Sequence, residues 1–441
     1  MRIPKDTPAV EELLAKLDTE AVTRVFTSRI PDDYRHWEEL KHRMPPEGMT
    51  LQEWWYALKL RRQASLKAVS LLDRHGNPFV FSTPDRIARQ LHEIDLGADG
   101  RIGNLQPVTN PETRDQYLIR SLMEEAITSS QLEGAVTTRK VAKEMLRSGR
   151  KPKDKSEQMI LNNYRTMQRI RGMKDQALTP EAVFELHRMV TESTLDHEDE
   201  AGRFRRSDER IAVEDDEGEI VHWPPPAAEL AQRMEAMCAF ANGRDTEPFV
   251  HPVIRAMILH FWLAHDHPFV DGNGRTARAL FYWSMLRADY WLFEYISISE
   301  VLRRAPTQYY RAFLYTETDE NDLTYFLIHQ CDVIRKAIDA LHDYISRKSR
   351  EIRESESLLR EWRHLNHRQQ AIISHALRHT ASSYTIESHQ RSHNTSYNTA
   401  RADLQSLVAE GLLEQHTQGR KMVFYPSPRL AGTIRDRQIG Q

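Results

Sequence analysis

The chain has few cysteines, no long apolar run and almost no net charge. Its 441 residues include only two cysteines, Cys238 and Cys331, which lie far apart and match no CxxC spacing. This excludes a disulfide framework and a cysteine-ligated zinc site and favours a reducing compartment. The best apolar stretch, AMILHFWLA, has about nine residues, far short of the roughly twenty that span a bilayer. Because the N-terminus also lacks the apolar run of a signal peptide, we expect a soluble cytoplasmic protein with no membrane segment.

The charges nearly balance, with 61 basic and 64 acidic side chains and a formal net charge of -3. This excludes a strongly basic nucleic-acid coat as the dominant property, although local patches remain compatible with it. An aromatic content of 8% is enough to build packed cores, so a disordered chain is excluded as well. The length suggests about three globular domains.

Helical patterns dominate and predict a mainly α-helical fold. Thr138 and Thr179 are expected to cap helix N-termini, and Pro180 and Pro252 are expected in first helical turns. Gly134 is expected to end a helix over about 117–134. Two β-hairpins interrupt the helices, one at HGNPFVF and an exposed one around the acidic turn of EDDEGEIVHW.

We expect four parts: an N-terminal helical region, a helical core, a charged helical linker and a small C-terminal domain. Their predicted boundaries are 1–110, 111–335, 336–365 and 366–441. The last part combines three helical patterns with a β-prone ribbon, which looks like a winged helix-turn-helix. From about residue 361 onward the chain holds roughly ten basic and about six acidic residues, a mild surplus compatible with phosphate contact.

Within that domain, Thr395–Glu410 would be the recognition helix. Tyr397, Asn398 and Arg401 would be exposed on it, while Leu404, Leu407 and Val408 would be buried. Gly419, Arg420 and Lys421 would lie at the wing tip. Such domains bind DNA or dock proteins, and both interpretations stay open.

The segment that carries chemistry is HPFVDGNGRTAR, His267 to Arg278, a loop that enters a helix N-terminus. The N–H groups of Gly272, Asn273 and Gly274 would be free to bind an anion, which the helix dipole also favours. Asp271 is placed to hold Mg²⁺ together with substrate oxygens. Arg275 and Arg278 share a helix face and could both bind phosphate.

His267 is the natural proton acceptor, and we expect Pro268 to hold its backbone extended. Together the loop's residues suggest nucleotidyl or phosphoryl transfer. The loop matches neither GxxxxGK[ST] nor GxGxxG. His260, His265 and His267 are residues of a type that binds zinc, but HExxH and CxxC are missing, so metal-hydrolase chemistry is not favoured.

HPFVDGNGRTAR resembles the signature of the Fic (Fido) family, HPFx[D/E]GN followed by [G/K]RxxR, at every fixed position. The resemblance extends over about 111–329 and includes GRFRR and VHWPPP. It implies a helical core with a small β-hairpin flap that holds the target segment. It also implies transfer of AMP from ATP to a Ser, Thr or Tyr hydroxyl of a target protein.

The resemblance also implies a role for each residue of the signature. His267 would be the general base, Asp271 the Mg²⁺ ligand, and Asn273 with Gly274 the anion hole. Arg275 would hold the β-phosphate region and Arg278 the γ-phosphate. Gly272 and, more loosely, Tyr295 would also contact the nucleotide.

A second motif, SSQLEG at 129–134, resembles the family's inhibitory [S/T]xxxE[G/N] sequence. The resemblance implies that Glu133 forms a salt bridge with Arg278 and denies this arginine to ATP. The alternatives are a DNA-binding regulator whose core senses nucleotide, transfer of UMP or phosphocholine, and removal of AMP. Gly274 argues against a kinase branch, which carries Lys there. A homodimer is compatible with the sequence, which does not identify the target.

Overall fold

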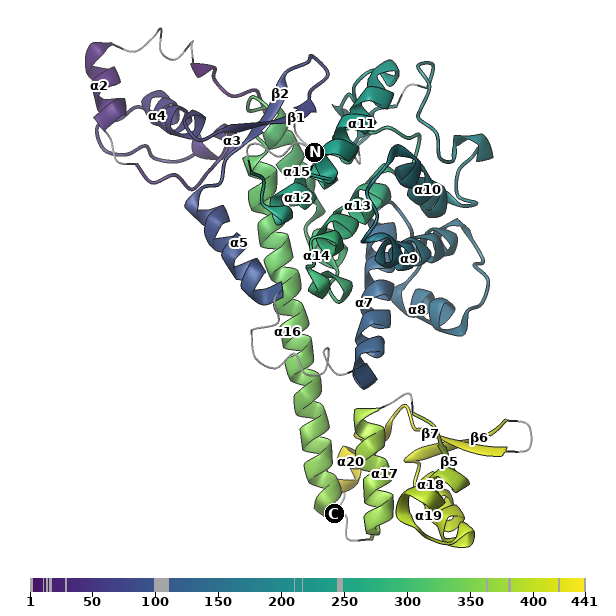
Figure 1. Cartoon of the computed structure of the whole chain (residues 1–441). Coiled ribbons are helices and arrows are strands. Elements are labelled where there is room, and N and C mark those ends of the chain that lie inside the picture. Colours follow the sequence, from purple (N-terminus) through teal and green to yellow (C-terminus); the bar gives the residue numbers. More distant parts are fainter. Residues whose placement is uncertain are drawn as a thin grey trace. The chain divides into compact units, whose positions relative to one another are not determined.

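A computed structural model of the chain describes residues 3–10, 12, 15, 18–27, 30–98, 111–209, 211–215, 217–243, 249–361, 364–379, 382–418 and 421–439. The fold is mainly α-helical, as predicted (Figure 1). By contacts it divides into two compact units, Met1–Ile102 with Ile119–Ile338, and Gly103–Leu118 with Asp339–Gln441. The four predicted domain boundaries stay predictions. Within the described ranges, no helix has both the length and the apolar character needed to cross a membrane.

The N-terminal region packs short helices around a hairpin. Its elements are α2 (Thr19–Thr27), α3 (Trp37–Leu40), α4 (Leu51–Gln63), β1 (Lys67–Leu72), β2 (Pro78–Phe81) and α5 (Asp85–Ala98). The antiparallel pair β1–β2 confirms the hairpin predicted at HGNPFVF. Helix α4 begins with a capping box in which Thr50 and Glu53 satisfy each other's N–H groups. This region is therefore ordered by local signals that the sequence displays.

The central helices form most of the first unit. They are α7 (Pro111–Leu132), α8 (Arg139–Ser148), α9 (Lys155–Met173), α10 (Pro180–Thr191), α11 (Leu230–Ala241), α12 (Pro252–Asp266), α13 (Asn273–Arg287), α14 (Ile298–Arg304), α15 (Pro306–Glu317) and α16 (Thr324–Glu361). Three 3-10 turns, η1 (Glu198–Glu200), η2 (Ala227–Glu229) and η3 (Trp291–Glu294), join them. Thr138, Thr179, Pro180 and Pro252 hold the helix-start positions predicted for them.

Helices α12 and α13 lie at the centre of this bundle and pack against each other (Figure 1). Both are buried along nearly their whole length, as expected of helices surrounded by other elements. Trp262 of α12 and Trp283 of α13 are at most 1% exposed. The loop between the two helices is thus anchored on both sides by the best-packed part of the chain.

The predicted flap hairpin is present but short. Strands β3 (Val213–Glu214) and β4 (Ile220–His222) pair antiparallel, with Gly218 in the turn at a φ of 80°. Glu217, Gly218 and Glu219 of the turn are exposed, as predicted, whereas the side chain of His222 is only 10% exposed. The hairpin therefore carries a histidine whose side chain is largely buried.

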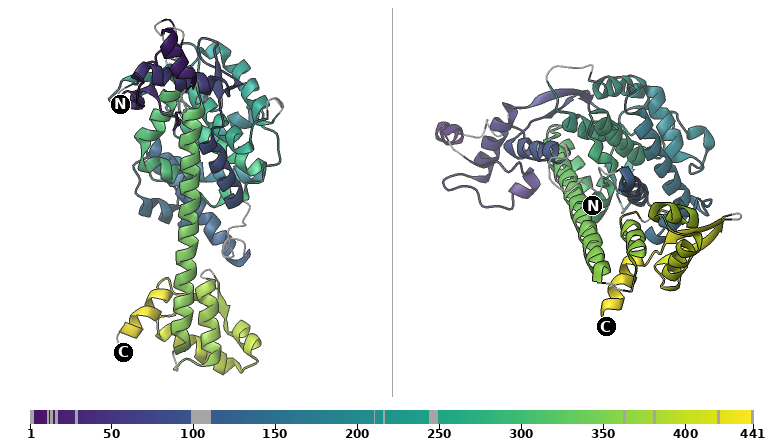
Figure 2. Two further views of the ribbon diagram at one scale, coloured as in Figure 1. Left: turned by 90° about the vertical axis from the view of Figure 1, so that its left-hand side faces the viewer. Right: turned by 60° about the horizontal axis from the view of Figure 1, so that its bottom comes forward.

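Residues 336–361 of the charged stretch predicted as a linker over 336–365 belong to a longer helix. Helix α16 begins at Thr324, within the first unit, and continues to Glu361 (Figure 2). The sequence shows no cap or proline between the apolar first half and the charged second half. The change in composition therefore does not mark the start of a new element.

The C-terminal region, 366–441, combines helices with a three-stranded sheet. It contains α17 (His367–Arg378), β5 (Tyr384–Thr385), α18 (Ile386–His393), α19 (Tyr397–Ala409), β6 (Leu413–Gln418), β7 (Lys421–Pro426) and α20 (Leu430–Ile439). The strand order is β5-β7-β6, all antiparallel. Leu404 and Leu407 are buried and Val408 is half-buried, while Tyr397, Asn398 and Arg401 are exposed, as predicted. Gly419 and Arg420 of the predicted wing tip lie outside the described residues.

Candidate active site

The site is built on the turn that joins α12 to α13. Gly272 precedes α13 with a φ of 83°, a conformation that favours glycine. A Cβ atom at this position would also come within 2.7 Å of Thr191 Cγ2 in α10. Glycine is thus required here both by the backbone turn and by the close approach of α10.

His267 closes α12, and its backbone is not extended as expected. It lies in the left-handed region with φ 43° and ψ 57°, and its N–H donates to Leu263 O at 3.0 Å. The expectation from Pro268 is wrong because the chain must turn sharply at the end of α12 to reach α13. Burial lowers the pKa of His267 to about 4. The imidazole is therefore neutral near pH 7 and can accept a proton.

Asn273 holds the loop with its side chain and leaves its own N–H unused. Its amide accepts from Phe269 N at 3.0 Å and donates to Phe269 O at 2.9 Å. Among the described residues, no hydrogen bond involves the N–H of Asn273 or of Gly274. These two groups begin α13, where the helix dipole favours a negative charge. The predicted anion cradle is thus geometrically open at its backbone.

Asp271 and Arg275 lie one turn apart at the edge of the cradle. The Asp271 side chain is 48% exposed, and its Oδ1 accepts from Gly272 N at 2.5 Å. Arg275 is fully buried and donates to Val190 O at 2.6 Å, with a longer contact of 3.4 Å to Asp271 Oδ2. The guanidinium thus binds mainly the end of α10, and one carboxylate oxygen of Asp271 is only weakly held.

Arg278 is buried and bound to the end of α7. Its Nε donates to Ser129 Oγ at 2.8 Å, and its Nη2 donates to Ser129 O at 3.0 Å. The salt bridge that the resemblance implies is present, since Nη2 lies 2.8 Å from Glu133 Oε1. Burial lowers the pKa of Arg278, but Glu133 outweighs it, so the net pKa is raised.

The Glu133 carboxylate also lies against the cradle itself. A Cβ atom built on Gly274 would be 2.2 Å from Glu133 Oε1 and 2.8 Å from its Cδ. Gly274 therefore leaves space that this carboxylate fills. An anionic group from α7 thus lies beside the first turn of α13, where a phosphate would be expected.

His187 is a site residue that the sequence analysis missed. Its ring stacks on Phe269 with centroids 3.8 Å apart, and its Nδ1 accepts from Gly202 N at 2.9 Å. Its Nε2 must then carry the proton and donate to Asp271 O at 2.8 Å. Burial lowers the pKa of His187 to about 4, which keeps this arrangement at neutral pH. No sequence pattern distinguished His187 from an ordinary helical histidine of α10.

Arg205, from the GRFRR segment, fastens the flap end to the loop. Its Nε donates to His267 O at 2.8 Å, and its Nη2 donates to Pro225 O. Its backbone N–H donates to Pro268 O at 2.9 Å. One arginine thus joins the proline segment after β4 to the backbone around His267.

Two other expected site groups have different surroundings. Tyr295 is 4% exposed and packs edge-on against Trp291, so its contact with nucleotide stays a prediction. The three histidines considered as zinc ligands are not brought together as a set. His260 binds Tyr309 Oη at 2.8 Å inside the bundle. In the part of the chain that the structure describes, the one group suited to a metal ion by type and distance is His222, His265 and Glu317.

Comparison with known protein families matches this part of the chain. The model of the Fic/DOC family covers residues 177–285, which include α10, the flap hairpin, the loop and most of α13. Residues 177–285 are a Fic/DOC domain. Glu133 lies outside the Fic/DOC match, so its contact with Arg278 rests on the structure and the SSQLEG motif.

Curated relatives of the Fic domain are named as enzymes. The chain is 35% identical over 117 residues to "Protein adenylyltransferase Fic" of Nematostella vectensis, across 26% of this chain and 25% of that protein. It is 37% identical over 115 residues to the protein of that name in Drosophila melanogaster, across 26% and 21%. The chain thus spans about a quarter or less of the length of these relatives.

A solved structure supports the Fic fold over a longer range. A Fic family protein from Desulfovibrio desulfuricans G20 superposes with a TM-score of 0.51 at 19% identity. The superposition covers 78% of this chain and 96% of that one. At this identity the likeness shows the fold alone.

Proposed function

We propose that the protein is an autoinhibited protein adenylyltransferase that moves AMP from ATP to a hydroxyl side chain of a target protein. The observation that carries the proposal is the contact of Glu133 with both Arg278 and Gly274. It joins the SSQLEG motif to the Fic signature at the point where ATP phosphates would bind. The name of the curated relatives supports the same activity.

In the proposed reaction His267 takes the proton of the target hydroxyl through Nε2. Its Nδ1 faces Ala264 O at 3.3 Å, which favours the proton on Nδ1 and a free electron pair on Nε2. The hydroxyl oxygen then attacks the α-phosphorus, the bond to the bridging oxygen breaks, and pyrophosphate leaves. Phosphate charge beside the loop would raise the pKa of His267 from its low value and strengthen it as a base.

The proposed roles of the remaining residues follow the same geometry. The N–H groups of Asn273 and Gly274 would bind phosphate oxygens, and Gly272 would allow their approach. Arg278, once released from Glu133, would bind the γ-phosphate. Arg275 would act from its buried position near the β-phosphate, where its Nε has no hydrogen-bond partner.

Asp271 fits the proposed Mg²⁺ site. Its side chain is half exposed at the edge of the cradle, and its Oδ2 is held only by the 3.4 Å contact to Arg275. An oxygen donor with this freedom, together with phosphate oxygens, is how Mg²⁺ is usually bound. When bound, Mg²⁺ would neutralise charge that develops on the leaving pyrophosphate.

The inhibition we propose is a competition for Arg278. A charge-assisted hydrogen bond contributes about 1.5–3 kcal/mol, so its loss should raise activity roughly ten- to a hundredfold. We also propose that the carboxylate repels a γ-phosphate directly, because it lies against Gly274. The resting enzyme would therefore be nearly inactive.

The test is labelling of the purified full chain with radioactive ATP and Mg²⁺. Glu133→Gly should modify itself more strongly than the wild type, while His267→Ala in the Glu133→Gly background should be silent. Glu133→Gln separates charge from volume, and Asp175→Gly, which removes an exposed acid at a turn, should behave as wild type. Equal labelling of all variants would contradict the mechanism.

Removal of AMP is a rival use of the same site. If the chain removed AMP, Glu133→Gly would lose activity toward an AMP-modified protein where the wild type has it. Mass spectrometry of lysate proteins incubated with Glu133→Gly should instead reveal an added AMP on a target, which would identify chemistry and partner together.

A second candidate function concerns the C-terminal region, for which we propose a winged helix that contacts DNA. The observation that favours it is the exposure of Tyr397, Asn398 and Arg401 along the first turns of α19. A gel-shift assay with salt titration tests this, since phosphate contacts make binding fall steeply with salt. If the region bound a protein instead of DNA, the gel shift would not change with salt concentration.

A further inference from the structure

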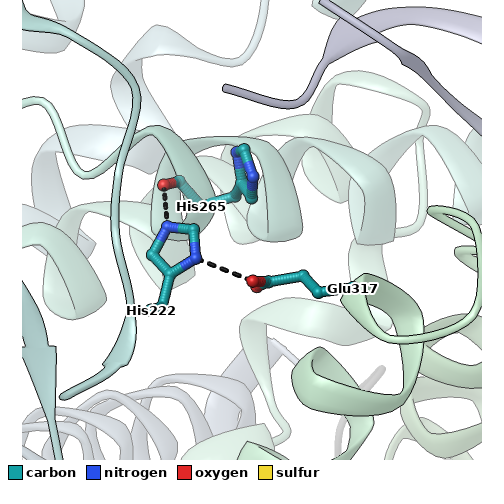
Figure 3. Close-up of side chains that lie close together, drawn as sticks. All are labelled: His222, His265 and Glu317. Atoms are coloured by element: carbon teal, nitrogen blue, oxygen red, sulfur yellow. Dashed lines mark hydrogen bonds and ion pairs between the residues drawn. The ribbon is translucent and has the colours of Figure 1, made fainter. Parts of the chain in front are cut away.

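His222, at the end of β4, has both ring nitrogens hydrogen-bonded to oxygen atoms (Figure 3). Its Nδ1 lies 2.8 Å from Glu317 Oε2, at the end of α15, and its Nε2 lies 2.8 Å from the carbonyl oxygen of His265 in α12. The side chain is 10% exposed. The flap hairpin is thus attached by one imidazole to two helices of the bundle.

The two partners fix the number of protons in this cluster. A carbonyl oxygen can only accept, so Nε2 of His222 must carry a proton. The contact between Nδ1 and Glu317 needs a second proton, because a neutral imidazole has only one N–H. The His222–Glu317 pair therefore holds one proton more than a neutral histidine beside an ionised carboxylate.

The surrounding charges place this proton on His222. Burial lowers the pKa of His222, but the nearby Glu317 more than reverses the effect, so the pKa is raised above its usual value. Burial raises the pKa of Glu317, and His222 outweighs it, so the net pKa is lowered. From α12, the ionisable groups that face the imidazolium are His265 and Asp266, and Asp266 in turn contacts Arg233 of α11.

We propose that His222 is a positioning residue that clamps β4 to the end of α12 when it is doubly protonated and releases the strand when it loses a proton. The clamp ends at His265, two residues before His267. It therefore sets the distance between the flap and the general base. This inference rests on the proposed function, in which β4 would pair with the target segment by main-chain hydrogen bonds.

The geometry favours a proton over a metal ion in this cluster. Each nitrogen of His222 is already directed at an oxygen atom at hydrogen-bond distance. A bound metal would need a nitrogen lone pair from His222, and both nitrogens of His222 are engaged with oxygen atoms. The contact of His265 Nδ1 with Asp266 Oδ1 at 3.1 Å leaves the other nitrogen of His265 available, so His222 is the group that would have to turn away from its partners.

The clamp acts on the hairpin and not on the segment that follows it. Pro225 is held by Arg205, whose charge does not change near neutral pH. Loss of the proton should therefore free β3 and β4 while the chain after them stays attached. The sign follows from the raised pKa of His222: the clamp is complete below about pH 6.5 and is lost as pH rises through the higher folded-state pKa.

The test uses the full-length protein and needs no activity. Hydrogen exchange of peptides that span β3 and β4, corrected for intrinsic rates, should show about tenfold more frequent opening at about pH 9 than at about pH 6. In Glu317→Gln the opening should be fast at both pH values. Glu219→Gln, which removes an exposed carboxylate from the same hairpin, is the matched control and should keep the wild-type profile.

Nuclear magnetic resonance of histidine-labelled protein gives the second readout. His222, assigned by its absence in His222→Gln, should titrate above about pH 6.5 and should titrate lower in Glu317→Gln. A His222 that titrates normally, with pH-independent opening of the hairpin, would overturn the clamp. Protection of the hairpin by Zn²⁺, reversed by a chelator, would also overturn it in favour of a metal site.

Self-labelling with ATP distinguishes the clamp from the proposed function. If Glu133→Gly forms no AMP adduct but His222 titrates as expected, the function fails and the clamp stands. If the rate of adduct formation changes neither with pH nor in the variant Glu317→Gln, the clamp has no role in positioning.

Discussion

Two buried charges, Arg278 in α13 and Asp403 in α19, each join helices through hydrogen bonds, but their surroundings differ. Next to Arg278 lie the N–H groups of Asn273 and Gly274, which no other described group uses. Asp403 is enclosed by polar side chains of its own region. In the proposed mechanism, the ion pair of Arg278 is regulatory because a phosphate can compete with Glu133 for this arginine.

The carboxylate of Asp403 has hydrogen-bond partners on several sides, all within the C-terminal region. Its carboxylate accepts from Asn366 at 2.7 Å, from Arg368 at 2.7 and 3.1 Å, and contacts His389 Nε2 at 3.1 Å. These partners join α17, α18 and α19. The charge is satisfied within the region, which leaves the exposed side of α19 free for other contacts.

Lowering the pH should destabilise the region around the loop before it destabilises the region around Asp403. This is the largest effect that we expect. Burial lowers the pKa of His187 to about 4, so protonation of this residue below about pH 6.5 should cost ~3 kcal/mol of unfolding free energy by pH 4. Burial raises the pKa of Asp403 and Arg368 outweighs it, so the hub at Asp403 should weaken only below about pH 3.8. Urea unfolding over this pH range measures the difference.

In the variant His187→Gln, the slope of the unfolding free energy against pH should decrease by an amount that corresponds to about one bound proton. His92→Gln, at an exposed position of α5, is the control and should leave the slope unchanged. An unchanged slope in His187→Gln would mean that the loop does not depend on a neutral histidine.

Asp403→Asn should cost about 2 kcal/mol of stability, because the new amide places N–H donors against Asn366 and Arg368. Thermal unfolding measures the loss. ATP labelling in the Glu133→Gly background should stay the same, since the hydrogen bonds of Asp403 given above all involve residues of the C-terminal region. A fall in labelling that exceeds the fraction unfolded would contradict the separation of the two hubs.

Ser129→Ala tests the network around Arg278, because it removes one of the hydrogen bonds of this arginine. Without the hydroxyl, Arg278 Nε loses a 2.8 Å hydrogen bond, and its hold on the end of α7 weakens. We expect labelling by the otherwise wild-type chain to rise about three- to tenfold. The effect should vanish in the Glu133→Gly background, and additive effects in this double-mutant cycle would refute a shared network.

Local features were predictable from sequence, because neighbouring residues decide them. The caps at Thr138 and Thr179 and the first-turn Pro252 follow from unsatisfied N–H groups at helix starts. The glycine turn at the start of α13 followed from the loop sequence, and its use as an anion cradle stays a prediction. The backbone of His267 did not, because the turn between α12 and α13 overrides the preference of a residue before proline.

Long-range partners were not predictable from pattern alone. Glu133 and Arg278 are 145 positions apart, and only the resemblance to Fic signatures paired them. His222 and Glu317 are 95 apart and were not paired at all. Which side chains meet across α12, α13 and α15 depends on how the bundle packs, and neither periodicity nor composition contains this information.

The smallest effect concerns Arg401 on the exposed side of α19. If the C-terminal region binds DNA through phosphates, Arg401→Ala should weaken binding for all sequences alike and reduce the magnitude of the salt slope by about one. Arg429→Ala, at an exposed position after β7, is a charge-matched control that should change binding less. Because Arg401 has no part in the Asp403 hub, thermal stability should stay the same. A loss of stability with no change in salt slope would assign Arg401 to structure and leave α19 without a role in DNA contact.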